Sequence, residues 1–381
     1  MTIKICKSCT TPTSRPRISF DSKGICNACN NSKEKSEIDW DHRKSEFIKI
    51  CGEIKNTSKM TNNEYDCIVP WSGGKDSTSI ALKLKFEFGL RPLLVTNSPL
   101  ILNEVGETNR ELLLNKGFDN IFIRPDQKIA KYLSKRFFIE RGNPKVAWDA
   151  GVNVVPVKIA IKFKIPFIFY AEHGESEYGG LVLNDKSMKV RDYEEVIEHQ
   201  IGDYPENWID EYVSLKDLNF YIYPDISEIE KINLKSYYFS YFFKWSMADN
   251  YDYVKKHLSN FKINETGRTT GTFTNFDSLD DKIDDLYYYM QYIKFGFGRA
   301  VRDTSRFIQN GRMNRDEAIK IIKKYDGEFP SKNMKEVLEY LDLNEIEFQK
   351  VIDKHRNTEI WKKNDKNDWL SSWELKNKLF P

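Results

Sequence analysis

The hexapeptide SGGKDS, residues 72–77, has the residue types and spacing that most plainly indicate chemistry in this sequence. The apolar run DCIVPW precedes it, and DSTSIALKLKFEFG follows with apolar residues at helical spacing. We therefore expect a strand, a tight turn and a helix. Gly73 and Gly74 allow backbone N–H groups to approach an anion, and the positive end of the helix dipole favours negative charge there.

The side chains of this turn are suited to a nucleotide phosphate. Ser72 and Ser77 offer hydroxyl groups, Lys75 offers a positive charge, and Asp76 is placed to bind Mg²⁺. The turn is not the longer G-x-x-x-x-G-K-[ST] loop of other nucleotide-binding proteins. An ordinary turn is the alternative, but the strand–turn–helix context favours a phosphate site.

A second cluster, YAEHGESEYGG, comes directly after a strongly apolar predicted strand. Ligands of parallel sheets bind beyond the carboxyl ends of the strands, so this cluster should lie at the binding edge. We expect Glu172 to bind Mg²⁺, and Glu175 or Glu177 to act as a base or to bind ammonium. His173 could take part. A solvated loop would also carry glutamates, although seldom after so buried a strand.

A third cluster is basic. Arg299, Arg302 and Arg306 are spaced i, i+3, i+7 and so share one helical face, and Lys294 precedes them. One interpretation is a solvated basic face with Asp303 as a local partner. The other is a clamp for the diphosphate or carboxylate of an anionic substrate.

The cysteines indicate a metal site. The chain has 6 cysteines, and four of them form two C-x2-C pairs, at Cys6 and Cys9 and at Cys26 and Cys29. This spacing is typical of four-thiolate zinc sites. Free cysteines are the main alternative, and an iron–sulfur cluster is a weaker one. We predict a zinc ribbon over residues 1–38 that is structural, since four protein ligands leave no open position.

These clusters require helices and strands that place them at one edge of a sheet. Strand and helix signals alternate after residue 65, with strands at DCIVPW, RPLLVTN, NIFIRP and IPFIFY. The pattern predicts an α/β fold with a doubly wound parallel sheet over residues 39–200. Within it we expect a polar helix over 39–54 and a loop at KNTSKMTNNEY. Residues 201–381 are predicted to be mostly helical.

The helical prediction for the C-terminal region rests on two patterns. Apolar residues recur at helical spacing at Ile283, Leu286, Tyr287, Met290 and Ile293. Further on, Asn314 and Glu317 have the spacing of a reciprocal helix cap.

Composition argues against several classes of protein. Among 381 residues, 59 Lys and Arg balance 57 Asp and Glu, so no overall positive field favours nucleic acid. The N-terminus lacks the apolar core of a signal peptide. The most apolar window, 152–171, contains two prolines and three lysines, which argues against a membrane span. We expect a soluble, cytoplasmic protein with no membrane contact.

SGGKDS resembles the PP-loop signature SGGxDS of the ATP-pyrophosphatase superfamily, which has a HUP-like fold. The resemblance implies that ATP is cleaved between its α- and β-phosphates and that AMP activates an oxygen of the substrate. It also implies that Val95, Thr96 and Asn97, at the end of the second strand, hold the adenine. Ordinary strand packing is the alternative for these three residues.

Longer stretches of the sequence indicate which branch of this superfamily the chain resembles. No cysteine follows Cys67, so the thiol pair of tRNA thiolases is missing, and the chain has no glutaminase domain. Three stretches are similar to the N-acetyl sugar amidotransferases of lipopolysaccharide and flagellar-glycan pathways. They are the double C-x2-C, IPFIFYAEHGESEYGG, and the stretch from SLDDKIDDLYYYMQYIKFGFGRAVRDTSRF to KKYDGEFP. The resemblance covers almost the whole chain and is weakest around 205–260. Trp71 departs from the small residue usual at this position, which could alter the rim of the pocket.

This family resemblance implies an ATP-dependent reaction that converts an acetamido group of a nucleotide-activated sugar to an acetamidino group, with Mg²⁺ and Zn²⁺ as metals. Lys75 would stabilise charge at the α-phosphate, and a glutamate of the second cluster would deprotonate ammonium. Ammonia would come from a separate glutaminase, of the sort paired with a cyclase-like subunit, for which the ribbon could be the dock. The rival interpretations are a tRNA-modifying ATP pyrophosphatase and a non-catalytic ATP-binding scaffold.

Overall fold

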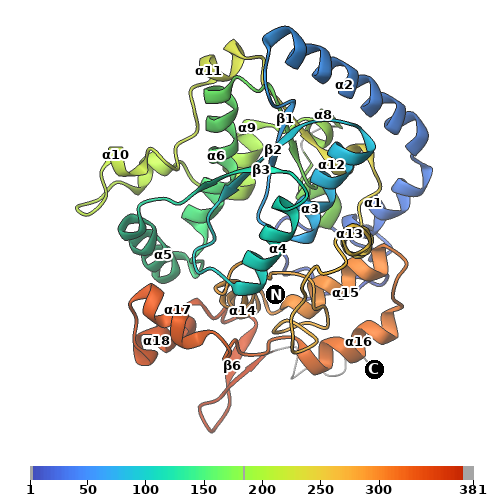
Figure 1. Ribbon diagram of the computed structural model, residues 1–381. Coiled ribbons are helices and arrows are strands. Elements are labelled where there is room, and N and C mark those ends of the chain that lie inside the picture. Colours follow the sequence, from blue (N-terminus) through green and yellow to red (C-terminus); the bar gives the residue numbers. More distant parts are fainter. Residues whose placement is uncertain (1–2, 183–184, 372–381) are drawn as a thin grey trace.

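The computed structural model describes residues 3–182 and 185–371, and its centre is a five-stranded sheet in which all strands are parallel (Figure 1). The strand order is β3-β2-β1-β4-β5. The strands are β1 (Cys67–Pro70), β2 (Pro92–Asn97), β3 (Asp119–Ile123), β4 (Phe167–Tyr170) and β5 (Lys235–Tyr238). The predicted α/β class with a parallel sheet is confirmed. The order reverses between β1 and β4, which is where sheets of this kind bind ligands.

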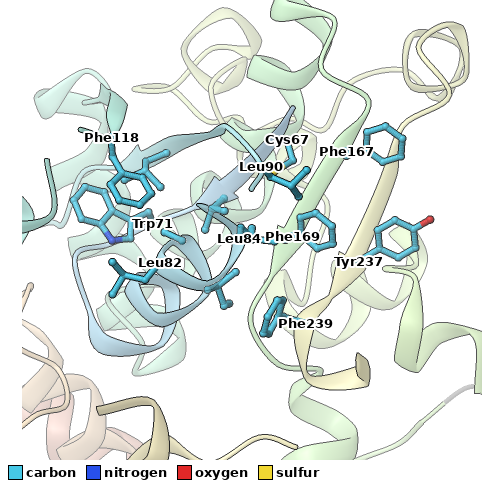
Figure 2. Packing of buried hydrophobic residues seen from close by; sticks show 14 of the residues in the cluster. Cys67, Trp71, Leu82, Leu84, Leu90, Phe118, Phe167, Phe169, Tyr237 and Phe239 are labelled. Carbon is cyan, nitrogen blue, oxygen red and sulfur yellow. The ribbon is translucent and has the colours of Figure 1, made fainter. Parts of the chain in front are cut away.

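Alternate residues of each strand pack on opposite faces of the sheet. In β1, Cys67 and Val69 join one core and Ile68 joins another. In β4, Phe167 and Phe169 belong to the first of these cores (Figure 2). Both faces are buried, so these strands read as continuous apolar runs, which explains why they were recognisable in the sequence.

Helices cover both faces of the sheet. The first core includes residues of α2 (Trp40–Thr61), α3 (Lys75–Leu82), α4 (Glu104–Leu114), α12 (Phe239–Phe242) and α13 (Met247–His257). The other face is covered by α6 (Val146–Phe163), with α11 (Ile226–Lys231) beside it. The remaining α-helices described before residue 240 are α1 (Asn27–Glu34), α5 (Gln127–Arg141), α7 (Gly174–Tyr178), α8 (Asp185–Lys189), α9 (Tyr193–Glu195) and α10 (Leu215–Leu218). Short 3₁₀ or π helices are η1 (Lys35–Glu37), η2 (Lys83–Glu87), η3 (Val196–Ile201) and η4 (Pro205–Trp208).

Two sequence-based boundaries differ from the structure. The helix predicted to end at Ile54 continues to Thr61, because residues 55–61 contain neither Gly nor Pro and its last turns still bury Ser58; Asn62, with φ 51°, ends it. The sheet also continues beyond residue 200. Its fifth strand, β5, begins with the polar residues Lys235 and Ser236, which gave no strand signal.

The C-terminal region is mostly helical, and in Figure 1 its elements gather below the sheet. They are α14 (Asp284–Phe295), α15 (Arg299–Gln309), α16 (Arg315–Tyr325), α17 (Met334–Leu341), α18 (Glu345–His355), β6 (Trp361–Lys363) and β7 (Trp369–Ser371). Ile283, Leu286, Met290 and Ile293 are buried together as predicted. The reciprocal cap between Asn314 and Glu317 is also confirmed. Among the described residues, no helix is both long enough and apolar enough to span a bilayer.

Candidate functional site

A cavity of about 300 Å³ opens at the carboxyl end of β1, and all residues of the predicted phosphate loop, 72–77, line it. We call it the loop cavity. Its opposite wall comes from the segment 276–280 and from α14, and Trp148 and Asp149 of α6 also contribute. A volume near the lower end of the range for ligand pockets, at the switch point of a parallel sheet, is typical of a small-molecule site.

The turn requires its glycine at position 73. Gly73 has φ +95°, and a Cβ there would lie 2.7 Å from Cγ of Arg110. After the turn, Gly74 caps α3 without a side chain, and its N–H donates to Oγ of Ser72 at 3.2 Å. The first N–H groups of a helix have no partner within it, so α3 presents them, with its dipole, at the cavity. The local geometry is therefore that of an anion cradle.

Lys75 is held in the cavity by two carboxylates. Its side chain is 2% exposed, and its ammonium donates to Asp76 at 2.7 Å and to Asp277 at 2.8 Å. Burial opposes the charged form, but Asp277 and Asp76 raise the pKa of Lys75 above its usual value. Asp277 also accepts from Arg302 at 2.7 Å. Burial opposes its ionisation as well, yet Lys75, Arg302 and Arg299 hold the pKa of Asp277 well below normal.

Asp277 is a site residue that the sequence interpretation missed. It lies 202 positions from Lys75 in the chain, just before α14. The available signal was the dense acidic run DSLDDKIDD that begins at this residue. We interpreted that run only as the start of a helix.

The basic face of α15 is not solvated, so that interpretation is wrong. Arg299 is 1% exposed, and Arg302 donates to Asp303 at 2.9 Å as well as to Asp277. Arg306 lies further along the same face. None of the three arginines lines the loop cavity, and Lys294 donates to a backbone carbonyl of α5 instead. A substrate clamp at these residues stays a prediction.

Glu172 is the glutamate of the second cluster that faces the phosphate loop. It accepts from the hydroxyl of Tyr178 at 2.7 Å. Burial raises the pKa of Glu172, and the negative charge of Asp76 raises it further. Two carboxylates that repel each other are suited to a shared divalent cation, so this pair fits the predicted Mg²⁺ site. Asp76 also accepts from Asn250 at 2.8 Å.

The other two glutamates point towards the N-terminal unit. Glu175 accepts from Arg17 at 2.6 Å, and although burial opposes ionisation this contact lowers the pKa of Glu175. Glu177 pairs with Lys35. Both therefore have structural partners.

His173 likewise serves the loop. Its Nδ1 accepts from the backbone N–H of Ser176 at 3.2 Å, which caps α7, and its Nε2 contacts Glu195. Both His173 and Glu195 are buried. The imidazole thus fixes the shape of the turn that carries Glu172.

A second cavity of about 460 Å³ lies on the other side of Glu172. We call it the second cavity. It shares Asp149 and Tyr287 with the loop cavity, so these two residues stand where the cavities meet. The carboxylate of Asp149 has no hydrogen-bond partner among the residues that the structure describes. Burial raises the pKa of Asp149 to about 7, although Lys145 partly opposes this.

The predicted adenine residues do not line the loop cavity. Val95 and Thr96 are buried, and the hydroxyl of Thr96 donates to the backbone carbonyl of Trp71 at 2.6 Å. An adenine contact at Val95, Thr96 or Asn97 stays a prediction. Trp71 is 2% exposed, lies in the core (Figure 2) and donates to Thr78 at 2.9 Å, so it supports α3 and does not form the rim.

The four predicted thiolates come together in a buried cluster. The sulfur atoms of Cys6, Cys9, Cys26 and Cys29 all lie within 4.8 Å of one another. Two of these separations are 3.9 Å (Cys6 to Cys29) and 3.7 Å (Cys9 to Cys26). Tetrahedral zinc–thiolate bonds of about 2.3 Å place sulfurs about 3.8 Å apart. The cluster therefore fits zinc, as predicted.

The surrounding unit is less regular than a ribbon hairpin and packs against the site. Its strand pairing consists of isolated bridges, and the second cysteine pair leads into α1. Thr10 contacts Ser305 of α15 at 2.9 Å, while Asn27 donates to the carbonyl of Gly180 at 2.8 Å. With Arg17 and Lys35, these contacts attach the unit to both α15 and the loop that carries Glu172.

A comparison with known families bears on the second half of the chain. Residues 270–379 match the family model described as "LPS biosynthesis protein WbpG-like, C-terminal domain". The matched segment contains Asp277 and the arginines of α15. It is similar to proteins of lipopolysaccharide biosynthesis, and this supports a biosynthetic role in glycan assembly. No curated protein matches the chain.

Proposed function

We propose that this protein is an ATP-dependent amidotransferase that converts an acetamido group of a nucleotide-activated sugar to an acetamidino group in surface glycan biosynthesis. The observation that carries the proposal is the contact of Lys75 with Asp277. It joins the phosphate loop to the segment that resembles lipopolysaccharide biosynthesis proteins. The proposal is supported by one site that combines an anion cradle with a part of the chain similar to lipopolysaccharide biosynthesis proteins.

The phosphates of ATP would lie against the N–H groups at the start of α3. Ser72 and Ser77 would donate to phosphate oxygens, and Lys75 would offset the charge that develops on the α-phosphate. Asp76 and Glu172 would hold Mg²⁺, which orients the departing pyrophosphate. Lys75 is already fixed by Asp76 and Asp277, so little reorganisation is needed when ATP binds.

The chemistry follows from the weak electrophilicity of an amide. The acetamido oxygen attacks the α-phosphorus, the bond to the β-phosphate breaks, and pyrophosphate leaves. Ammonia then adds to the carbon of the resulting imidate, and AMP departs with the former amide oxygen. The amidine carbon thus exchanges a C–O bond for a C–N bond, and ATP is converted to AMP and pyrophosphate.

A base is needed because ammonia is mostly ammonium near neutral pH. Asp149 has the properties required, since it stands where the two cavities meet and its pKa is raised to about 7. The sequence predicts a glutamate of the 172–177 cluster as the base, but Glu175 and Glu177 already pair with Arg17 and Lys35. We propose Asp149 for proton transfer, because Glu172 faces Asp76 and suits the metal.

Ammonia would come from a separate glutaminase, since the chain has no glutaminase motif of its own. The N-terminal unit is already engaged with α15 and the Glu172 loop. Its outer side remains the proposed dock for this partner.

The experiment is to measure pyrophosphate release from ATP, Mg²⁺ and ammonium chloride with a panel of acetamido nucleotide-sugars. Mass spectrometry of the sugars would detect replacement of O by NH. Lys75→Met should abolish release, and Lys135→Met on α5, which removes a surface ion pair of Lys135 with Asp342, should not. Pyrophosphate release without any change in the sugar would contradict the proposal.

A further inference from the structure

The second cavity has the lining of a site for a ring-shaped, hydroxylated ligand. Three tyrosines, Tyr170, Tyr238 and Tyr287, contribute to its walls, and carboxylates lie among them. Aromatic faces pack against the apolar faces of sugar rings, and carboxylates accept from hydroxyl groups. The cavity meets the loop cavity at Asp149 and Tyr287, so a ligand in it would reach the place where ATP is proposed to react.

Arg191 is the distinctive residue of this cavity. Its guanidinium lies 3.7 Å from the ring centre of Tyr170 and donates to the side-chain oxygens of Asn153 and Gln200. It forms no ion pair with a carboxylate within residues 3–182 and 185–371. Arg302, by contrast, is paired with two aspartates.

The lining carboxylates do not serve as its counter-charge: Asp149 forms no ion pair with Arg191 within the described residues, and the three glutamates have other partners. Glu175 pairs with Arg17, Glu195 contacts His173, and Glu172 accepts from Tyr178. A half-buried guanidinium without an acidic partner favours an anion from outside the chain. Its planar donors match the oxygens of a phosphate or a carboxylate.

We propose that the second cavity binds the acceptor sugar, with an oxyanion of the acceptor on Arg191 and its ring beside Tyr170 and Tyr238. The oxyanion is either a phosphate of the nucleotide carrier or a carboxylate on the ring. The acetamido group then lies at the junction formed by Asp149 and Tyr287. This inference rests on the proposed function, because it assigns the acceptor of that reaction to a place.

The test is calorimetry with the loop cavity filled by α,β-methylene ATP and Mg²⁺. The probes are N-acetylglucosamine, its 1-phosphate and N-acetylglucosaminuronic acid, which separate a neutral sugar from the two sources of oxyanion. We expect the wild type to bind at least one anionic probe more tightly than the neutral sugar. Arg191→Gln should lower the affinity for that anionic probe about tenfold or more. Its affinities for the neutral sugar and for the ATP analogue should stay unchanged.

Two further variants serve as controls. Arg191→Lys keeps the charge and should retain part of the affinity, which separates charge loss from misfolding. Arg312→Gln removes an exposed arginine that pairs with Asp249 and Asp252, and should bind as the wild type does. Equal binding of the anionic probes by wild type and Arg191→Gln would overturn the inference. If the wild type binds the anionic probe through Arg191 but does not bind the ATP analogue, the proposed function is overturned instead.

Discussion

Replacement of Asp149 by Asn should stabilise the protein at alkaline pH while it removes activity. The pKa of Asp149 is raised from 3.8 to about 7, mainly by burial. The folded state therefore holds this proton more tightly than the unfolded chain does. Its contribution to stability is fully present below about pH 4 and is lost as the pH rises through 7. Asparagine carries no charge at any of these pH values.

The size of this change in stability follows from the rise in the pKa of Asp149. Each pKa unit corresponds to about 1.4 kcal/mol, so the full rise would amount to about 4 kcal/mol at pH 8. Asp149 opens onto two cavities, and water there offsets part of the cost of burial. We therefore expect Asp149→Asn to raise the free energy of unfolding by about 2 kcal/mol at pH 8 and by little at pH 4.5.

The assay is urea unfolding of wild type and variant at several pH values between 4.5 and 8. Asp342→Asn, at an exposed position, is the matched control, and its effect should be small throughout. Equal stability of wild type and Asp149→Asn at pH 8, or a difference that does not vary with pH, would refute the reasoning about burial.

The same variant tests the role of the carboxylate in catalysis. The groups that face Asp149 are Lys145, Asp284 and Tyr287, and the first two oppose each other in their effect on its pKa. Wild-type turnover with ammonium should rise with pH and level off above about pH 7, because only the ionised carboxylate accepts a proton. Asp149→Asn should turn over at least tenfold more slowly and lose this pH dependence. An unchanged pH profile would assign the base elsewhere.

Three other predictions concern the loop and the metal. Lys75→Met should lower pyrophosphate release by about 100-fold or more while the thermal midpoint stays within a few degrees, since a charge at the α-phosphate is lost; near-normal release would contradict the phosphate-loop assignment. Tyr178→Phe removes a hydrogen bond to Glu172 and should weaken Mg²⁺ binding several-fold in titrations, and unchanged binding would argue against metal at Glu172. Cys26→Ser should lose zinc and speed hydrogen exchange over residues 172–180, whereas unaltered exchange there would show that the N-terminal unit does not support this loop.

Much of the sheet was predictable because its central strands are buried on both faces. Each appears as a short apolar run between turn residues, and the phosphate loop follows the first of them. The exception is β5, whose first half is polar because it lies at the edge of the sheet. The cysteine cluster was predictable because metal sites depend on spacing more than on packing.

The partners of each site residue were less predictable, because they depend on contacts between distant segments. Spacing placed Glu172, Glu175 and Glu177 in one loop, but only the packing of the N-terminal unit shows that Glu175 and Glu177 pair with Arg17 and Lys35. Asp277 is distant from Lys75 in the chain, and no local pattern connects them. Asp149 lies in an apolar helix, where a single carboxylate gave no signal of the cavities that it separates.

The most direct test of the central claim is to follow the oxygen of the acetamido group. A nucleotide-sugar labelled with ¹⁸O at the acetamido carbonyl would be incubated with the protein, ATP, Mg²⁺ and ammonium, and the AMP analysed by mass spectrometry. The proposed reaction transfers the label to the phosphate of AMP, with one equivalent of pyrophosphate and one of amidino sugar. AMP without the label, or a sugar that keeps its ¹⁸O while pyrophosphate is released, would contradict activation of the amide oxygen by ATP.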